Sequence, residues 1–257
     1  LEVSGLSVWG EQKGWSKDDH DVLQLWKEEG KKVGKNYQLP IPLKDPSEFI
    51  PDNFVVAKAM LHSLVKRLKR EGRFQKYDDD IRDLLKQNYA EKVSETTMAS
   101  YGRINYLPHH YVLVPKWRVV FNAKCKFKGK SLNDRAHQGP NLLKEIVNVL
   151  LRFRVGKYAM QGDLKAMYYQ VLIPEEQRDL LRFLWVDSDG DLLVLRHTRH
   201  VFGGVWCAAS SSYALLSTLQ DVEAIHPTIR HACLLYTIEA AHASTRRRCV
   251  GERSPDK

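Results

Sequence analysis

The sequence predicts an α+β fold in which an antiparallel sheet packs on helices. Helical and strand patterns alternate along the chain without the regular strand–helix–strand period of a parallel sheet. Two strand patterns, LRFLWV and DLLVLRHT, flank the short turn DSDG, which is typical of an antiparallel hairpin. With 257 residues, of which 43% are hydrophobic and 28% charged, the chain can bury a core in one large or two small domains.

The charge balance of the chain favours a polyanionic partner. The sequence has 40 Lys and Arg residues against 31 Asp and Glu residues, a formal net charge of +9. Such an excess is common in nucleic-acid-binding proteins, although charge alone does not decide the function. The sequence lacks an apolar run of the roughly 18 residues that a membrane span needs, so we expect no membrane partner.

The cysteines and histidines predict no metal centre. The four cysteines are widely and irregularly spaced, without a C-x-x-C pair, which indicates free thiols in a reducing compartment and no zinc site. His109 and His110 lie in a proline-flanked loop without a second ligand pair at metal spacing, so we interpret them as structural residues. The cysteines are Cys125, Cys207, Cys233 and Cys249.

Residues 1–50 predict a polar linker or a partly ordered arm. Their tryptophans are scattered among charges, and the proline-rich run QLPIPLKDP follows Tyr37. The chain begins with Leu1 instead of Met, and its start lacks a charged segment followed by an apolar one, so we expect no signal peptide. We interpret the chain as a piece of a longer product or an incomplete gene model.

Two amphipathic helices are expected after this segment. From Phe54 onward, the apolar residues follow the i, i+3, i+4, i+7 spacing of one helical face, and the opposite face is basic. A second helical pattern follows, preceded by Asp78, Asp79 and Asp80, whose negative charge favours a helix N-terminus. The first helix has the apolar residues Leu61, Leu64, Val65 and Leu68 and the basic residues Lys58, Lys66, Arg67, Lys69 and Arg70, and the second has Ile81, Leu84, Leu85 and Tyr89.

Strand patterns then take over. Residues 111–114 and 117–121 are rich in β-branched and aromatic side chains, which predicts two strands. The following loop, NAKCKFKGKSLND, contains four alternating lysines that would share one side of an extended segment. These lysines are Lys124, Lys126, Lys128 and Lys130.

The remaining elements are two helices and the hairpin described above. Asn141 is expected to cap a strongly apolar helix, LLKEIVNVLLRF, which is typical of a core element. Gly203 and Gly204 interrupt the chain before a helix of small residues, CAASSSYALLSTL.

The stretch MQGDLKAMYYQV contains the residue with the clearest chemical interest. Asp163 follows a short apolar run and precedes two tyrosines. An ionised carboxylate is costly to desolvate unless it is paired or holds a cation, so Asp163 is either a turn or cap residue or a cation ligand. Three segments follow one another in a fixed order: the basic strand pattern KWRVVF, the acid and aromatic stretch GDLKAMYYQV, and the aromatic–glycine turn VFGGVW.

Together these three segments resemble a reverse transcriptase. The runs RVVFNAKCKFKGKSLND, QGPNLL and FGGVW, together with the stretch from LLRFRVGKYAMQGDL to RFLW, resemble more narrowly the polymerase of BEL/Pao retrotransposons. The likeness extends over roughly residues 37–220. It implies an RNA-directed DNA polymerase with fingers and palm in residues 51–232, incomplete at the C-terminal end, and an RNA template, a DNA primer and deoxynucleotide triphosphates as partners.

The resemblance also implies roles for individual residues. Asp163 matches the first catalytic aspartate, and Leu164 matches a residue whose carbonyl also binds the metal. Tyr168 matches the ring that packs under the incoming sugar and excludes a 2′-hydroxyl. Phe202 and Gly203 match a turn that approaches the nucleotide and the template base.

Two groups of basic residues receive roles in the same way. Lys116 and Arg118 match the residues that hold the triphosphate, because Lys supplies a mobile charge and Arg a planar fork of donors. Without the resemblance, they would be the solvated face of an edge strand. The basic face of the helix that starts at Phe54 is either solvated surface or a template contact. The residues of that contact would be Lys66, Arg67, Lys69 and Arg70. The expected cofactor is Mg²⁺, with Mn²⁺ as the alternative.

The sequence departs from this family where the second carboxylates are expected. No Tyr-x-Asp-Asp motif occurs beyond the glycine turn, where the family pattern places it, and Ile238, whose side chain cannot bind Mg²⁺, lies two residues after Tyr236. Glu239 is the one carboxylate at this position. Smaller departures are Asn122, Ala208 and Ala209. We therefore expect this chain to be inactive or nearly inactive by itself, and residues 233–257 to be a divergent tail, disordered or frame-shifted.

Three interpretations stay open. The chain is either a polymerase domain or a non-catalytic nucleic-acid-binding remnant of such a domain, and a decayed copy that does not fold stably is a third interpretation. The resemblance implies a cytoplasmic location, in the virus-like particle of a retroelement, with the nucleus as the alternative. The sequence does not predict the oligomeric state.

Overall fold

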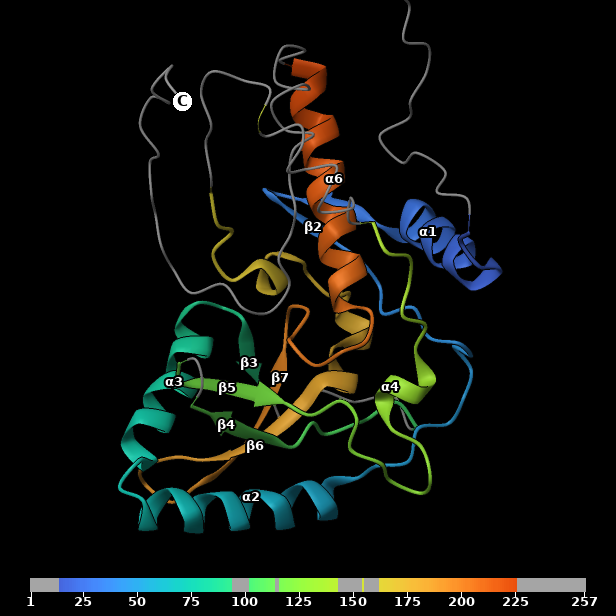
Figure 1. Cartoon of the computed structure of the whole chain (residues 1–257). Helices are drawn as coiled ribbons and strands as arrows, with labels where there is room; N and C mark the ends of the chain where they lie inside the picture. Colours follow the sequence, from blue (N-terminus) through green and yellow to red (C-terminus); the bar gives the residue numbers. More distant parts are fainter. Residues whose placement is uncertain (1–13, 94–101, 114–115, 143–153, 155–161, 226–257) are drawn as a thin grey trace, which may run out of the picture.

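The structure is a computed structural model that describes residues 14–93, 102–113, 116–142, 154 and 162–225 (Figure 1). Its helices, including two 3₁₀ helices labelled η, are α1 (Lys17–Glu29), α2 (Phe54–Arg70), α3 (Phe74–Lys86), α4 (Leu132–Arg135), η1 (Met167–Gln170), η2 (Glu175–Leu181) and α6 (Cys207–Ile225). Its strands are β1 (Lys31–Val33), β2 (Asn36–Gln38), β3 (Ala90–Lys92), β4 (His109–Val112), β5 (Arg118–Phe121), β6 (Arg182–Val186) and β7 (Leu192–His197).

The named strands form three small sheets, and every pair in them is antiparallel. The largest sheet has the order β3–β7–β6, and the other two are the pairs β4–β5 and β1–β2. The predicted hairpin is β6 and β7, with Arg182 opposite Arg196 and Val186 opposite Leu192. The α+β class with antiparallel pairing is therefore confirmed.

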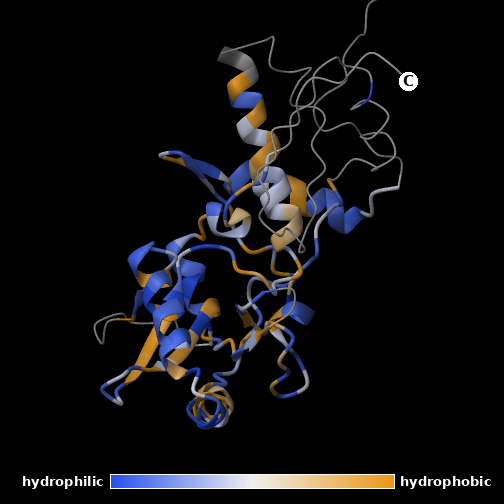
Figure 2. Cartoon of the chain, turned by 60° about the vertical axis from the view of Figure 1, so that its left-hand side comes forward, coloured by the Kyte–Doolittle hydropathy of each residue, from blue (hydrophilic) through white to orange (hydrophobic). Residues whose placement is uncertain are grey.

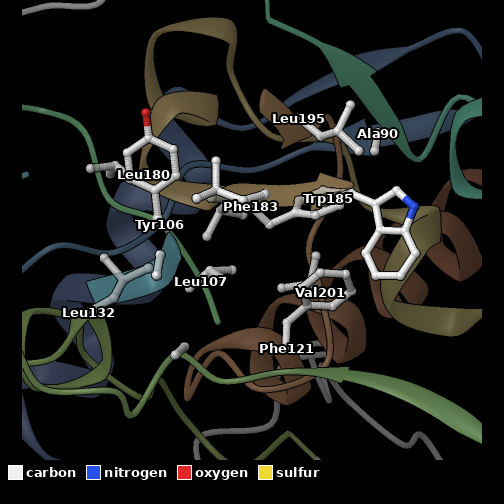
Figure 3. Packing of buried hydrophobic residues seen from close by; sticks show 14 of the residues in the cluster. Ala90, Tyr106, Leu107, Phe121, Leu132, Leu180, Phe183, Trp185, Leu195 and Val201 are labelled. Atoms are coloured by element: carbon white, nitrogen blue, oxygen red, sulfur yellow. The ribbon is translucent and has the colours of Figure 1, made fainter. Parts of the chain in front are cut away.

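The main hydrophobic core lies between the β3–β7–β6 sheet, the β4–β5 pair and α2. Figure 3 shows Phe183 and Trp185 of β6, Leu195 of β7 and Phe121 of β5 packed together, and each is at most 2% exposed. The apolar stripe of α2 covers this core, as its spacing predicts. In Figure 2 the strands near the core are coloured largely as hydrophobic, whereas the β1–β2 hairpin is coloured largely as hydrophilic.

Residues 14–50 fold, in contrast to the linker or arm that the sequence predicts for residues 1–50. Ser16 forms a capping box with Asp19 at the start of α1. Trp26 is 1% exposed, its ring centroid lies 5.4 Å from that of Tyr213 on α6, and its Nε1 donates to the Pro40 carbonyl at 3.0 Å. The apolar residues of this segment are few, but their partners lie far along the chain, where a local pattern does not reveal them.

The second predicted helix begins earlier than expected. The sequence places Asp78, Asp79 and Asp80 before its N-terminus, but α3 begins at Phe74, so these acids lie inside the helix. The Asp78 side chain is buried and accepts hydrogen bonds from Trp185 Nε1 at 2.7 Å and from Arg82 Nε at 2.8 Å. These two donors satisfy the carboxylate and make its burial in the helix tolerable.

The structure describes only some of the remaining residues on which the sequence makes predictions. The helix expected after Asn141 and the tail 233–257 lie outside the described residues. Cys125 and Cys207 have free thiols, whereas Cys233 and Cys249 lie outside the described part. None of the helices that the structure describes combines the length and the apolar character of a membrane span.

Candidate functional site

The glycine turn before α6 lies directly against the end of β5. Gly203 has a φ of +122°, and a Cβ atom at this position would lie 2.2 Å from the Phe121 carbonyl oxygen. Only glycine permits this conformation together with this approach. The resemblance assigns to Gly203 a close approach to a nucleotide. In the structure, the Phe121 carbonyl of β5 occupies the space that a Cβ atom at Gly203 would fill.

Asn133 of α4 holds both sides of this turn. Its Nδ2 donates to the Gly203 carbonyl at 2.9 Å, and its Oδ1 accepts from the Val205 N–H at 3.0 Å. No pattern in the sequence predicted this role for Asn133. The available signal was the capping box of Ser131 and Asp134, which marks the short helix that orients Asn133.

Tyr168 and Phe202 form an aromatic pair next to the glycine turn. Their ring centroids are 5.7 Å apart with an interplanar angle of 56°. Phe202 is 42% exposed, and Tyr168 is half-buried on η1, which contacts α6. Burial raises the pKa of Tyr168, and the nearby Cys207 adds to this effect. The structure thus brings two of the predicted nucleotide-binding residues together.

A second, inner tyrosine supports this pair. The ring of Tyr169 stacks on Tyr89 with centroids 4.5 Å apart, and its carbonyl accepts from Arg199 Nη1 at 3.0 Å. Burial raises the pKa of Tyr169 far above its usual value, so the phenol stays neutral. Of the two consecutive tyrosines, Tyr169 therefore packs inside the protein, and Tyr168 lies at the surface.

Asp163 and Leu164 lie on the exposed segment that leads into η1. Both side chains are exposed, Leu164 to 47%. Within the described residues, Asp163 has no hydrogen-bond or ion-pair partner, and the turn or cap role stays an alternative because residues 155–161 lie outside them. Five residues separate it from Tyr168, so the chain limits their Cα distance to about 18 Å.

Lys116 and Arg118 lie at the start of β5. Arg118 pairs with Val112 of β4, and Lys116 is exposed. Trp117, between them, stacks on Tyr111 with centroids 4.6 Å apart and donates from Nε1 to the Asp80 carboxylate. Arg118 is half-buried, and its Nε atom is shielded from solvent. About 10 Å of strand separates Arg118 from Phe121, which the glycine turn contacts.

The basic residues at the end of α2 are partly occupied by contacts within the protein. The Arg67 guanidinium lies 4.7 Å from the ring centroid of Tyr111, and the Lys69 ammonium lies 5.4 Å from that of Phe74. Lys66 and Arg70 are exposed. A template contact through these four residues stays a prediction.

The described residues contain one carboxylate of the expected metal site, that of Asp163, next to Leu164 with its carbonyl. Asp163 offers an exposed carboxylate, the oxygen donor that Mg²⁺ prefers, and protein-bound Mg²⁺ often uses one or two carboxylates together with substrate phosphates. In the described part of the chain, no group of three or more His, Cys, Asp or Glu residues is arranged to hold a metal ion. Glu239, the other carboxylate considered, lies outside that part. The donor type of Asp163 fits the expected ion, but one carboxylate does not complete a site.

Comparison with known proteins gives a distant structural similarity. No protein-family model matches the sequence, and no curated protein matches it. Among solved structures, the chain is similar to a foamy viral protease-reverse transcriptase dRH in complex with double-stranded DNA, with a TM-score of 0.44 and 15% identity. The match covers 81% of this chain and 33% of that chain, so this chain spans about a third of the length of the viral protein.

Proposed function

We propose that residues 51–232 are the fingers and most of the palm of a reverse transcriptase domain from a BEL/Pao-type retrotransposon polyprotein. The observation that carries this proposal is the fixed order of the segments KWRVVF, GDLKAMYYQV and VFGGVW along the chain. The contact of the glycine turn with β5 and the pairing of Tyr168 with Phe202 support it, because they join ends of the three segments.

In this proposal the protein residues bind and orient a deoxynucleotide triphosphate. Lys116 and Arg118 neutralise the phosphates, and Arg118 adds directed hydrogen bonds. The rings of Tyr168 and Phe202 provide flat apolar surface for the sugar and the base. Asp163, with the Leu164 carbonyl, would hold Mg²⁺, which supplies charge stabilisation at the transferred phosphate when it is bound.

We further propose that the chain by itself is inactive or nearly inactive in RNA-directed DNA synthesis. The Ile238 side chain offers no metal-binding oxygen at the position of the expected second carboxylate. Loss of the electrostatic stabilisation of developing charge lowers rates by about two to three powers of ten for a single donor. The loss of metal ligands should have at least this effect.

Primer extension on an RNA template, with Mg²⁺ or Mn²⁺, tests the activity. We expect no synthesis above background from the 257-residue chain. Asp163→Asn is compared with Asp189→Asn, which changes another exposed carboxylate, in the β6–β7 turn. Synthesis that Asp163→Asn abolishes and Asp189→Asn leaves intact would overturn the inactivity and support the polymerase. Synthesis that both variants retain would overturn the role of Asp163.

Nucleotide binding tests the site even if the chain is inactive. The proposal expects affinity for deoxynucleotide triphosphates that increases with Mg²⁺ and loses this increase in Asp163→Asn but not in Asp189→Asn. The same metal dependence in both variants would contradict a metal site at Asp163.

A second candidate function is a non-catalytic nucleic-acid-binding module. The replacement of a carboxylate position by Ile238, together with the net charge of +9, favours it. It predicts binding that weakens steeply with salt and is indifferent to sequence, to Mg²⁺ and to Asp163. The nucleotide-binding comparison above therefore separates the two functions.

A further inference from the structure

The lysine-rich loop between β5 and α4, residues 122–131, is a defined structure with fixed ends. At its base, the Asn122 N–H donates to the Pro108 carbonyl at 2.7 Å, and the Asn133 N–H donates to the Ala123 carbonyl at 3.1 Å. At its tip, Phe127 and Lys130 exchange backbone hydrogen bonds at 3.0 and 3.3 Å. In Figure 1 this loop lies below α4, on the side of α2.

The side chains of this loop alternate between solvent and protein. Lys124, Lys126 and Lys128 are exposed, whereas Cys125 and Phe127, between them, are half-buried. The Cys125 sulfur lies 3.9 Å from that of Met60 on α2, which fixes the inner side of the loop. The three ammonium groups therefore extend from one anchored segment into solvent.

These three lysines differ from the fourth in their charge partners. Lys130 Nζ lies 2.7 Å from the Glu48 carboxylate, which also has Arg135 at 3.7 Å. Within the described residues, none of the other three lysines has a carboxylate at ion-pair distance. Lys128 lies with its ammonium 5.8 Å from the Phe127 ring centroid, at the edge of the same surface.

Besides Glu48, the carboxylate of Asp134 lies near the loop. The backbone and the hydroxyl of Ser131 lower the pKa of Asp134, and the charges of Lys126 and Lys44 add to this. The Lys44 ammonium donates to the Asp134 carbonyl at 3.0 Å, so a further cation is present. Lys126 and Lys44 therefore lie near an acid that already has hydrogen-bond donors, and the three loop lysines outnumber this acid.

The base of the loop adjoins the candidate site. Lys124 follows Phe121 by three residues, so their Cα atoms are at most about 11 Å apart. The glycine turn contacts the Phe121 carbonyl. Asn133, just after the loop, donates a hydrogen bond to the same turn. A polyanion that reached the candidate site would pass within the reach of the lysine side chains.

We propose that Lys124, Lys126 and Lys128 bind the phosphodiester backbone of a nucleic acid strand at the entrance of the candidate site. This inference rests on the proposed function, since it assigns a partner surface to that site. Lysine supplies a compact charge on a flexible stem and reads no base, so the contact is sequence-independent. Phe127 is turned toward the protein, and the surface offers no exposed ring for base stacking.

The test is the salt dependence of binding to a labelled single-stranded RNA of mixed sequence, without primer or nucleotide. Each phosphate contact contributes about 0.7 to the slope of log K against log salt for a single strand. The Lys124→Gln, Lys126→Gln, Lys128→Gln triple variant should lower this slope by about 2 and weaken binding on the order of 100-fold at 0.1 M salt. Circular dichroism spectra and thermal unfolding verify that each variant is folded.

Two controls separate a specific contact from a general change in charge. The variant with Lys27, Lys86 and Lys92 changed to Gln loses the same three charges from exposed positions on α1, α3 and β3, and its slope should stay that of the unaltered chain. Lys130→Gln, next to the surface but paired with Glu48, should also have little effect, in contrast to Lys124→Gln. If the triple variant does not fold, Lys128→Asn replaces it, because Asn tolerates the positive φ of 48° at that position.

The outcomes also separate this inference from the proposed function. Equal slopes for the loop variant and the dispersed variant would overturn the inference, and nucleotide binding that depends on Asp163 would leave the proposed function intact. Binding to vesicles that contain phosphatidylserine but not to RNA, or no binding to RNA at all, would overturn the inference as well. A reduced slope for the loop variant alone supports it, whether or not the chain synthesises DNA.

Discussion

Gly203 combines two constraints that can be separated by substitution. Its φ of +122° disfavours any side chain, and a Cβ atom would also meet the Phe121 carbonyl. Gly190, in the β6–β7 turn, has a φ of +93° but nothing within 4 Å of a built Cβ atom. Gly190→Ala therefore measures the conformational cost alone.

We expect Gly203→Ala to lower the free energy of unfolding by more than Gly190→Ala does. A residue held in a disfavoured backbone region costs about 1–3 kcal/mol, and the displacement of β5 backbone adds to this at Gly203. Urea unfolding followed by circular dichroism measures both variants. Equal losses would mean that the contact of the glycine turn with β5 contributes nothing to the free energy of unfolding.

Three buried histidines make the stability of the fold sensitive to acid. Burial lowers the pKa of His109 to about 4, that of His197 to about 3 and that of His200 to about 4. His109 accepts from the Tyr77 hydroxyl at 2.5 Å, and His200 accepts from Trp206 Nε1 at 2.8 Å. Each of these two rings donates from Nε2 to a backbone carbonyl, and this arrangement requires the neutral form.

His197 differs because it lies between the rings of Phe121 and Phe183, with centroids 4.3 and 4.6 Å away. Neither of its ring nitrogens has a hydrogen bond of normal geometry in the described structure, although the nearby Tyr89 carbonyl partly offsets the lowering of its pKa. A charged His197 would have to leave this apolar position.

We therefore expect the free energy of unfolding to fall as the pH drops below the unfolded-state pKa of 6.5. The neutral histidines bind protons in the unfolded chain first, so their contribution is full above pH 6.5 and decreases through the range down to about pH 3. Each histidine contributes a slope of at most about 1.4 kcal/mol per pH unit. His197→Phe should reduce the slope by that amount, whereas the exposed His62→Gln should not; an unchanged slope in His197→Phe would contradict the burial of a neutral ring.

At the scale of elements, the contact of α1 with α6 decides whether the N-terminal segment belongs to the fold. Trp26 is buried against Tyr213, with its indole N–H bonded to Pro40. The hairpin that follows is held to α6 as well, because Asp221 accepts from Lys32 at 2.5 Å and from the Tyr37 hydroxyl at 2.9 Å. Burial raises the pKa of Tyr37 to about 12, which keeps its phenol a donor.

Trp26→Ala should lower the free energy of unfolding by about 3–5 kcal/mol, the usual effect of removing a buried tryptophan. Gln24→Ala, an exposed position on the same helix, should change it by less than about 0.5 kcal/mol. Denaturant midpoints compare the two variants. If Trp26→Ala were as mild as Gln24→Ala, residues 14–50 would behave as the arm that their composition suggests.

The elements that could be predicted from the sequence are those whose pattern is local. The spacing of Leu61, Leu64 and Leu68 defines α2, and the DSDG turn defines the β6–β7 hairpin. The docking of α1 could not be predicted in this way, because Trp26 and Tyr213 are far apart in the sequence. The start of α3 was missed because the partner that makes a buried Asp78 acceptable, Trp185, is 107 residues away.

The same distinction between local patterns and long-range contacts applies to the candidate site. The sequence identified residues that the structure brings together, Tyr168 with Phe202, because each belongs to a recognisable segment. It could not reveal that the Phe121 carbonyl occupies the space beside Gly203, or that Arg67 and Lys69 lie on aromatic rings. These contacts depend on how separate elements pack.

At the scale of the whole molecule, the two hydrophobic clusters share backbone connections. Trp26, Leu39 and Tyr213 belong to the smaller cluster, and Trp185 and Trp206 belong to the larger one. The Leu39 carbonyl accepts from His200 Nε2 at 2.9 Å, and the Leu39 N–H donates to Leu172 at 3.0 Å, so the chain that joins the clusters is fixed on both sides. Unfolding of one cluster would remove hydrogen-bond partners from the other.

We therefore expect one cooperative thermal transition for the described body of the chain. Circular dichroism follows the helices, and fluorescence follows all six tryptophans, of which Trp26 lies in the smaller cluster and Trp185 and Trp206 in the larger one. The two signals should give coincident curves, which is the test of a two-state transition. Trp26→Ala should lower the midpoint of both curves together, because the clusters unfold as a unit. A broad loss of signal without a transition would instead identify a decayed copy that does not fold stably, and two separate transitions would show that the α1–α6 contact and the larger core are independent.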